Sequence, residues 1–296
     1  MTLTEYQHYV VHTVDSFLVD TIEQLPEHAP QLKQAMRYAL LIGGKRMRPF
    51  LLFATGEMLR VQASDLLGAA AAIEAVHAYS LIHDDLPAMD DDELRRGHPT
   101  CHIKFDEATA ILAGDALQTL AFELLCNCEL SAQNHPKRIE LVKLLSQAAG
   151  YLGMCGGQAM DLAATNQQIN QIQLEALHSK KTGALISACV TMAITLANNV
   201  SEQDSQTLQR YAQLIGLAFQ VQDDILDVVS DSATLGKPQG SDQALNKSTY
   251  PALLGLAQAK AYLNELHQEA LQALHTLPYN THMLESFTDF IIQRKY

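Results

Sequence analysis

The sequence lacks tryptophan, and aromatic residues make up only 6% of its 296 positions. It also lacks any Cys-x-x-Cys pair, and its cysteines are odd in number: Cys101, Cys126, Cys128, Cys155 and Cys189. This pattern argues against a disulfide framework and against a zinc site. Free thiols are typical of a reducing compartment, so we expect a cytoplasmic protein.

Positive charge is scarce. Lysine and arginine number 20 against 33 aspartates and glutamates, which gives a formal net charge of −13 and a pI near 5.3. Because no block of basic residues is present, this balance argues against nucleic acid as a partner. The net negative charge is still compatible with an anionic small molecule as ligand, provided that a few cationic residues gather at its binding site. The hydrophobic fraction of 48% is typical of a compact globular protein.

Long hydrophobic runs are scarce as well. Near the N-terminus, Glu5, Asp15 and Asp20 interrupt the apolar residues before a signal-peptide core can form. Residues 182–201 carry no charge, but their strongly apolar part, 184–197, would span only about 21 Å as a helix. A hydrocarbon layer is about 30 Å thick. We therefore predict a buried core helix here and no membrane span.

Helical periodicity dominates the chain, and long alternating strand patterns are absent. The predicted helices, separated by proline, glycine and asparagine breaks, cover residues 66–82, 108–125, 139–149, 174–197, 207–229 and 251–274. No repeat and no shift in composition marks a boundary, so we expect one all-α domain over residues 1–296. The longest polar connection, 230–248, has a length that is usually functional or disordered.

A first acidic cluster follows the predicted helix 66–82. Six acidic residues occupy ten positions from Asp84 to Glu93, where a helix C-terminus already carries partial negative charge, so a counterion is expected. Pro87 removes a backbone donor and distorts the turn, which would let Asp84 and Asp90 converge on one ion. The alternative for this cluster is a solvated acidic turn.

A second acidic cluster, Gln220-Val-Gln-Asp223-Asp224-Ile-Leu-Asp227, lies inside the predicted helix 207–229. Asp223 and Asp227 are about 40° apart around the helix axis, and carboxylates on a mostly apolar helix are costly without a partner. Clusters of oxygen ligands without histidine or cysteine suit Mg²⁺, which binds one or two carboxylates together with substrate phosphates. Two such clusters could clamp a diphosphate. Calcium buffering is a weaker alternative, because the loop spacing of an EF-hand is missing.

Cations gather after a glycine pair in Gly43-Gly44-Lys45-Arg46-Met47-Arg48-Pro49. Exposed backbone N–H groups there can join Lys45 and Arg48 around phosphate oxygens, although a solvated basic turn is the plain alternative. His77 stands seven residues before Asp84 on nearly the same helix face, a placement that is by itself typical of a core histidine. Further cations adjoin the clusters or stand in the polar connection: Arg95, Arg96, Lys181, Lys237 and Lys247.

Together these motifs resemble those of the trans-prenyl diphosphate synthases, and within that family the bacterial-type farnesyl diphosphate synthases. The matching pieces are the glycine-rich basic segment 43–49, Asp84-Asp85-x₄-Asp90 with Arg95-Arg96, Lys181-Thr182, Gln220-x-x-Asp223-Asp224-x-x-Asp227, Gly236-Lys237 and Gly255. The resemblance implies the isoprenoid synthase fold, a single all-α bundle of ten or more helices around a central cavity, usually as a homodimer.

Carried onto this sequence, the resemblance also implies residue roles. Asp84 and Asp90 would bind two Mg²⁺ ions and Asp223 a third, with Mn²⁺ as a conceivable substitute. The allylic diphosphate would be bound by Arg95, Lys181 and Lys237. Isopentenyl diphosphate would be bound by Gly44, Lys45, Arg48, His77 and Arg96. The Lys181 carbonyl, the Thr182 hydroxyl and the Gln220 amide would face the developing carbocation.

The implied activity condenses isopentenyl diphosphate with dimethylallyl or geranyl diphosphate to give farnesyl diphosphate. An aromatic residue at Tyr79, about 7.5 Å below Asp84 along a helix, would limit the product to C15, with the small Ser80 beside it. The first alternative keeps the chemistry with a C10 or C20 product and leaves Tyr79 as plain core. The others are a terpene cyclase, disfavoured by Lys45 and Arg48, and a regulatory subunit, disfavoured by two intact aspartate motifs.

Overall fold

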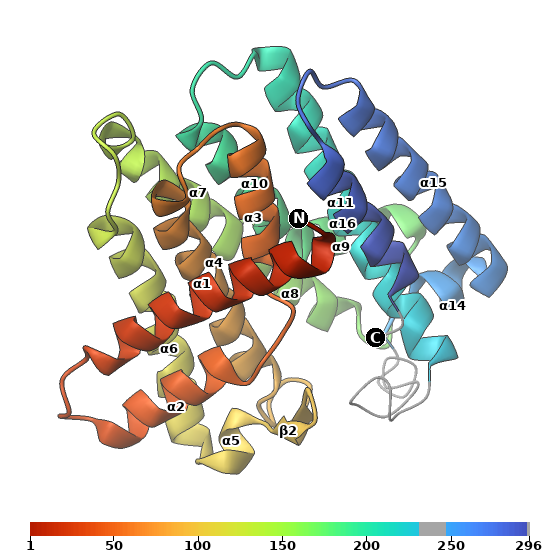
Figure 1. The fold of residues 1–296 in the computed structure, drawn as a ribbon. Coiled ribbons are helices and arrows are strands. Elements are labelled where there is room, and N and C mark those ends of the chain that lie inside the picture. The colour runs from red at the N-terminus through yellow and green to blue at the C-terminus, as the bar shows by residue number, and fades with distance from the viewer. Residues whose placement is uncertain (231–246, 295–296) are drawn as a thin grey trace. The chain divides into compact units, whose positions relative to one another are not determined.

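The fold is described on a computed structural model, which covers residues 1–230 and 247–294. Its contacts divide the chain into two compact units. The first unit consists of Met1–Phe53 and Gln62–Val142, and the second of Ala54–Val61 and Lys143–Tyr296. Helices dominate both units (Figure 1), so the all-α prediction is confirmed. A single domain over residues 1–296 stays a prediction.

The first unit contains the helices of the N-terminal half and a short hairpin. Its helices are α1 (Leu3–Glu23), α2 (Pro30–Leu41), α4 (Ala63–Asp84), α5 (Cys101–Lys104) and α6 (Glu107–Asn127). A 3₁₀ turn (His135–Lys137) follows α6. Two further helices, α3 (Met47–Met58) and α7 (Arg138–Ala149), have residues in both units.

Helix α1 shows how local sequence starts a helix in this unit. The Thr2 hydroxyl accepts the Glu5 backbone N–H at 3.3 Å, and the Glu5 carboxylate accepts the Thr2 N–H at 2.8 Å. This reciprocal capping box satisfies two donors that the first turn leaves without intrahelical partners. A stripe of one residue per turn is then buried: Tyr6, Val10, Val14, Leu18 and Ile22.

Helix α4 is the centre of the first unit. It is buried on most sides and contacts α1, α2 and α6, which explains why its sequence is apolar nearly all round. The predicted helix 66–82 is confirmed and extends to Asp84, so the first acidic cluster begins where α4 ends. The sequence analysis missed the hairpin β1 (Leu94–Arg95) and β2 (His98–Pro99), whose strands are only two residues long.

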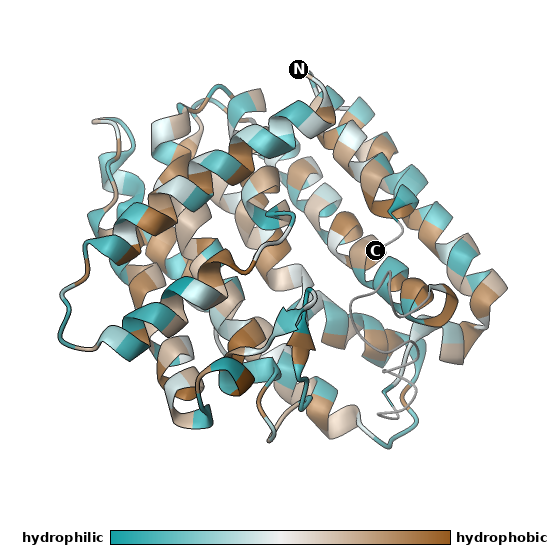
Figure 2. Cartoon of the chain, turned by 60° about the horizontal axis from the view of Figure 1, so that its bottom comes forward, coloured by the Kyte–Doolittle hydropathy of each residue, from teal (hydrophilic) through white to brown (hydrophobic). Residues whose placement is uncertain are grey.

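The second unit contains the other helices that the described residues form. They are α8 (Met154–Ala164), α9 (Gln171–Lys181), α10 (Gly183–Leu196), α11 (Glu202–Val229), α14 (Tyr250–Leu254), α15 (Leu256–His275) and α16 (His282–Gln293). Helices α11, α15 and α16 lie side by side (Figure 1) and contact one another. Each of them buries one set of residues and exposes another, as an amphipathic helix does, and Figure 2 shows hydrophobic and hydrophilic residues occurring together along the helices of the chain.

Two of the predicted helices are interrupted in the structure. The segment 174–197 was expected as one helix, but it breaks at Thr182, which ends α9 and precedes α10. The segment 251–274 was also expected as one helix, but Gly255 has φ 81° and ψ 151° and separates α14 from α15. That positive φ is accessible to glycine at little cost, so the chain can turn there. Both predictions of a continuous helix were wrong.

Apolar helices occur in both units. Helix α10 is buried on most sides, which confirms the core helix predicted within residues 182–201. Two other helices, α4 and α6, are long and apolar enough to cross a membrane, and 72% and 44% of their most apolar windows are buried in the protein. Core helices of soluble proteins meet the same criterion, so the finding is weak evidence for a span. The absence of a membrane span stays a prediction.

Candidate active site

The glycine-rich basic segment of the first unit forms a tight loop before α3. Gly43 and Gly44 have φ of 101° and 125°, and both are exposed. The Arg96 guanidinium donates to the Gly43 carbonyl. It lies so close to Gly44 that a Cβ atom there would be 2.5 Å from its Nη1. A side chain at Gly44 would displace the end of Arg96 and would be strained at this positive φ, and the structure brings these two predicted diphosphate ligands into contact.

Arg46 lies in the middle of that loop. The basic residues beside it suggest a solvated side chain, but Arg46 is buried. Only 4% of the residue is exposed, and its guanidinium bonds Asp15 and Glu74 at 2.7 Å each and the Leu40 carbonyl at 2.5 Å. Burial works against its charge, but the Glu74 and Asp15 carboxylates outweigh it and raise the pKa of Arg46. Sequence reasoning missed this anchor, because nothing in the basic run separates Arg46 from Lys45 and Arg48.

The other predicted isopentenyl ligands surround the loop. The Lys45 carbonyl accepts the Gln7 side chain at 3.1 Å, which fixes the backbone at that position. His77, on α4, is partly buried, and this burial together with the positive charges of Arg48 and Arg96 lowers its pKa well below 6.5. His77 is therefore neutral at pH 7, and it would hydrogen-bond a phosphate rather than neutralise it.

The first aspartate motif folds back on itself. Helix α4 ends at Asp84, and the Asp90 N–H then donates to the Asp84 carbonyl at 2.9 Å. The residues between them, including Pro87, form the turn that makes this contact. Both aspartates are partly exposed. The turn around Pro87 thus brings the backbones of Asp84 and Asp90 together, and the convergence of their carboxylates on one ion stays a prediction.

Asp85, between them in sequence, has a different environment. It is 3% exposed, and the Arg95 Nε bonds its two oxygens at 2.8 and 2.9 Å. Burial raises the pKa of Asp85, while the Arg95 guanidinium opposes that rise. In this structure Arg95 is thus committed to Asp85, and its role toward an allylic diphosphate stays a prediction.

The two residues expected to set product length lie on α4. Tyr79 is 7% exposed, and its ring meets His83 edge-on with centroids 5.4 Å apart. The Ser80 hydroxyl donates back to the His77 carbonyl at 2.9 Å. Tyr79 is the bulkier of the two side chains, and its role in setting product length stays a prediction.

In the second unit, Lys181 is held at the end of α9. Its Nζ pairs with Asp161 of α8 at 2.6 Å. A Cβ atom on Gly157 of α8 would lie 2.1 Å from the Lys181 backbone nitrogen, so α8 and α9 meet backbone to backbone at this point. Sequence reasoning did not single out Asp161, because twenty positions separate it from its partner and no pattern links them.

Thr182 and Gln220 are in contact in the second unit, and their role toward a carbocation stays a prediction. The Thr182 hydroxyl donates to the Gln220 Oε1 at 3.1 Å, and the Gln220 Nε2 donates to the Asp224 Oδ1 at 2.9 Å. The other Asp224 oxygen accepts the backbone N–H of Tyr250 at 3.0 Å. Thr182 is available for this contact because the chain breaks between α9 and α10 at this residue.

The other two aspartates of the second motif differ in exposure. The Asp223 side chain is 40% exposed and pairs with Arg294 at 2.7 Å, whereas Asp227 is 4% exposed. Arg294 also lies over the Phe219 ring, 4.0 Å from its centroid. Arg294 thus supplies a positive charge at one oxygen of the carboxylate that is proposed to bind a metal ion.

The proposed metal ligands fit a hard cation. Among the described residues no three histidine, cysteine or carboxylate side chains gather into a complete metal cage. Mg²⁺ does not need one, because it keeps several waters and takes one or two carboxylates with substrate phosphates. Asp84, Asp90 and Asp223 are the partly exposed oxygen donors of the two motifs. Lys237 lies outside the described residues.

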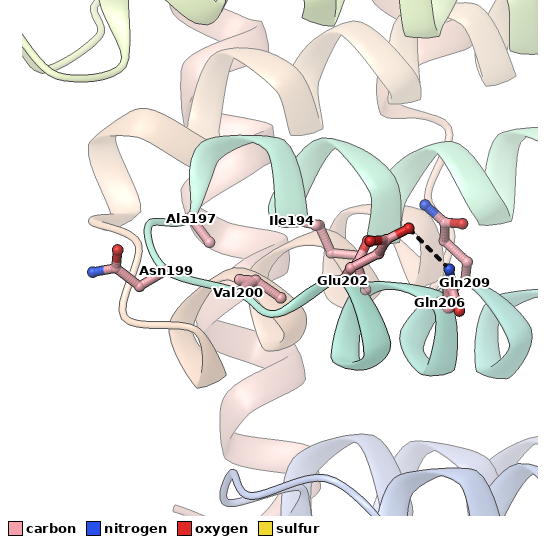
Figure 3. Close-up of a pocket in the computed structure, with 8 residues that line it drawn as sticks. Ile194, Ala197, Asn199, Val200, Glu202, Gln206 and Gln209 are labelled. Atoms are coloured by element: carbon pink, nitrogen blue, oxygen red, sulfur yellow. Dashed lines mark hydrogen bonds between the residues drawn. The ribbon is translucent and has the colours of Figure 1, made fainter.

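A hollow of about 520 Å³ opens where α10 turns into α11 (Figure 3). Its lining mixes aliphatic residues, Ile194 and Val200 among them, with polar ones, and the Gln206 amide donates to Glu202 at 3.4 Å. Gln209 precedes Gln220 on α11 by eleven residues, or about 16 Å of helix. This hollow is therefore separate from the second aspartate motif.

Comparison with known proteins decides the family. The family model "Polyprenyl synthetase" matches residues 29–281. The chain belongs to the polyprenyl synthetase family. The family recognised from the motifs and the prediction of a prenyltransferase are thus confirmed.

Individual relatives of this polyprenyl synthetase cover nearly its whole length. It is 52% identical to the farnesyl diphosphate synthase of Haemophilus influenzae over 95% of each chain, and 53% identical to that of Escherichia coli over 92% of each. A geranyltransferase from Helicobacter pylori, crystallised with magnesium and isoprenyl diphosphate, is 37% identical with a TM-score of 0.85, covering 99% of this chain and 97% of that one. These relatives support both the fold and the C15 product expected from the sequence.

Proposed function

We propose that this polyprenyl synthetase condenses isopentenyl diphosphate with dimethylallyl diphosphate and then with geranyl diphosphate, releasing diphosphate and forming (2E,6E)-farnesyl diphosphate. The observation that carries the proposal is the contact of the Thr182 hydroxyl with the Gln220 carbonyl oxygen. It places two neutral oxygens side by side, in a unit that also carries Lys181 and Asp223. The names of the relatives support a C15 length for the prenyl chain of the product.

The first unit binds isopentenyl diphosphate. Lys45 and Arg48 supply charge, Arg96 lies on the glycine pair, and neutral His77 supplies a hydrogen bond. Gly44 leaves the backbone open to phosphate oxygens. Because Arg46 is bonded internally, the loop keeps its shape before substrate arrives.

The allylic diphosphate is held by the aspartate motifs and by cations. Asp84, Asp90 and Asp223 are the ligands for Mg²⁺, three ions for each site, with Mn²⁺ as a substitute. When bound, Mg²⁺ neutralises the charge that develops on the departing diphosphate. Lys181, Arg95 and Lys237 add positive charge around the same group, and Asp161 keeps Lys181 in place.

The reaction needs no nucleophilic side chain. The allylic C1–O bond breaks, its electron pair leaves with diphosphate, and the isopentenyl double bond attacks C1. A proton then leaves C2 of the isopentenyl unit, with the released diphosphate as its acceptor. The Thr182 and Gln220 oxygens lower the energy of the cation most when its charge is fully developed, which is what accelerates a reaction.

We also propose that the enzyme is a cytoplasmic homodimer without a membrane span. Helix α6 supports this proposal, because it leaves Ile111 and Leu112 exposed by 43% and 55%. Light scattering of the purified chain should give twice the monomer mass of 32.6 kDa. A monomer at micromolar concentration would refute this part.

The test of the function is incubation with ¹⁴C-isopentenyl diphosphate, geranyl diphosphate and Mg²⁺, followed by phosphatase treatment and mass analysis of the alcohols. We expect farnesol as the main labelled product and almost none from Asp84→Asn. Asp20→Asn removes one charge from an exposed position of α1 and serves as the matched control. A main product of C10 or C20 would overturn the chain length. Unlabelled cyclic hydrocarbons would indicate a cyclase.

A further inference from the structure

Asp224 stands in an aspartate motif, yet its surroundings differ from those of a metal ligand. It is 2% exposed, whereas the side chain of neighbouring Asp223 is 40% exposed. One Asp224 oxygen accepts the Gln220 amide at 2.9 Å and the other accepts the Tyr250 backbone N–H at 3.0 Å. Each oxygen thus already has a protein donor.

The bond to Asp224 decides which way the Gln220 amide points. A carboxylate only accepts hydrogen bonds, so the NH₂ end of the amide must face it. The carbonyl end then lies on the other side, where it accepts the Thr182 hydroxyl at 3.1 Å. Turning the amide over would set two acceptors against each other beside Asp224.

The same chain of bonds orients Thr182. Its hydroxyl donates its single proton to Gln220. Only the lone pairs of the Thr182 oxygen are then left to interact with a substrate. Tyr250 is the first residue of α14, where a helix leaves its N–H groups without intrahelical partners. Asp224 takes up one of these groups, and the start of α14 in turn fixes the carboxylate.

We propose that Asp224 is a positioning residue that holds the Gln220 carbonyl oxygen, and not its NH₂ group, toward the allylic cation. The inference rests on the proposed function, which places Gln220 beside the carbocation. An inverted amide would present partial positive charge to a cation and oppose its formation. Asp224 therefore acts on the chemical step through Gln220, without touching substrate or metal.

The first test is Asp224→Asn, which keeps the shape and can donate to the Gln220 carbonyl, so the amide is free to invert. We expect kcat to fall by about 100-fold, the lower end of the cost of one lost preorganised dipole, with KM for both diphosphates within about twofold of wild type. Raised Mg²⁺ should not restore the rate. Recovery at high Mg²⁺ would show that Asp224 is a metal ligand and overturn the proposal, as would an unchanged kcat.

Rescue separates positioning from mere structural support. In the double variant Gln220→Glu/Asp224→Asn, the new glutamate has an oxygen at both ends, and the new asparagine can donate to one of them. An oxygen then faces Thr182 in either orientation. We expect kcat of the double variant to be at least about tenfold higher than that of Asp224→Asn, which corresponds to 1.36 kcal/mol. Failure of this rescue would overturn the proposal, because lost tethering of Tyr250 cannot be repaired at Gln220.

Thr249→Ala is the matched control for that tether. The Thr249 hydroxyl accepts the Ala252 N–H at 3.3 Å and so caps the same helix, α14, without bonding Gln220. We expect a lower melting temperature but wild-type kcat. A fall in kcat equal to that of Asp224→Asn would assign the effect to α14 and contradict the proposal.

The orientation is also measurable without turnover, by NMR of protein labelled with ¹⁵N-glutamine. The Gln220 side-chain NH₂ signal is the one that disappears in Gln220→Glu, and we expect it to shift in Asp224→Asn and stay in place in Thr249→Ala. If the wild type makes no prenyl product but the signal shifts in Asp224→Asn, the proposed function fails while the orientation of the amide stands. If the product forms and the signal does not move, Asp224 does not orient the amide.

Discussion

The buried ion pairs of Arg46 allow a quantitative prediction for stability. Replacing Arg46 with methionine keeps an unbranched side chain of similar length but leaves Glu74, which is 3% exposed, without its charge partner. Removing one member of a buried pair costs about 3–5 kcal/mol. Asp15, whose side chain is 32% exposed, adds little because water can solvate it. We therefore expect Arg46→Met to lower the free energy of unfolding by about 3–5 kcal/mol.

The assay is urea unfolding followed by circular dichroism, applied as a double-mutant cycle. Glu74→Met alone should be about as costly, because it leaves a buried guanidinium, while the double methionine variant should recover most of the loss. Arg37→Met is the control, since the Arg37–Glu23 pair at 3.1 Å has both side chains at least half exposed and is worth about 0–1 kcal/mol. If the losses in unfolding free energy of the two single variants simply add in the double variant, with a coupling energy below about 0.5 kcal/mol, the reasoning is refuted.

Three further predictions concern other parts of the protein. Gly157→Ala should destabilise by about 1–3 kcal/mol or more in urea, because its Cβ would lie 2.1 Å from the Lys181 nitrogen, while Gly183→Ala, whose Cβ has only a 3.6 Å contact, should be neutral or stabilising. Burial lowers the pKa of His178 from 6.5 to about 4, so the unfolded chain takes up a proton first and stability should fall from pH 6.5 to about 4. His178→Gln should flatten that fall in melting temperature; an equally steep fall would contradict it. Tyr79→Ala should shift the product to C20 or longer by mass analysis, and a variant still limited to C15 would remove Tyr79 as the cavity floor.

Much of the fold could be predicted because the apolar periodicity is strong. Helices such as α4 and α6 carry long apolar stretches that only a buried helix explains, and both appeared within a few residues of their predicted bounds. The break at Thr182 could not be predicted in this way. The residues before it, His178–Lys181, are polar or charged and can either end one helix or continue it, so the hydrophobic pattern does not fix where the break falls.

The hairpin 94–99 was missed for a different reason. Its strands are too short to show alternation, and its turn places Arg96 at φ 53° and Gly97 at φ 77°. Two positive φ values are what a two-residue hairpin turn requires, and glycine supplies only one of them readily. Arg96 adopts the other, and its guanidinium bonds the Gly43 carbonyl. Sequence alone does not reveal that contact.

Motif spacing identified most candidate site residues but could not separate ligands from their supports. Arg46 and Lys45 are neighbours in one basic run, and Asp224 and Asp223 are neighbours in one acidic run. Burial distinguishes them, because Arg46 and Asp224 are 4% and 2% exposed and bonded to other parts of the protein. That difference depends on the packing around each loop and helix, which a local pattern does not encode.

Helix α11 carries Gln220, Asp223 and Asp224 within little more than one turn of a continuous helix of 28 residues. Each residue added to a helix advances it by about 1.5 Å and rotates it by about 100°. A single insertion or deletion upstream of Gln220 would misalign all three groups at once, and no local adjustment could correct them separately. Point substitutions along α11 can therefore change one of these groups at a time, whereas an insertion or deletion between Gln220 and Asp224 changes their spacing and orientation together.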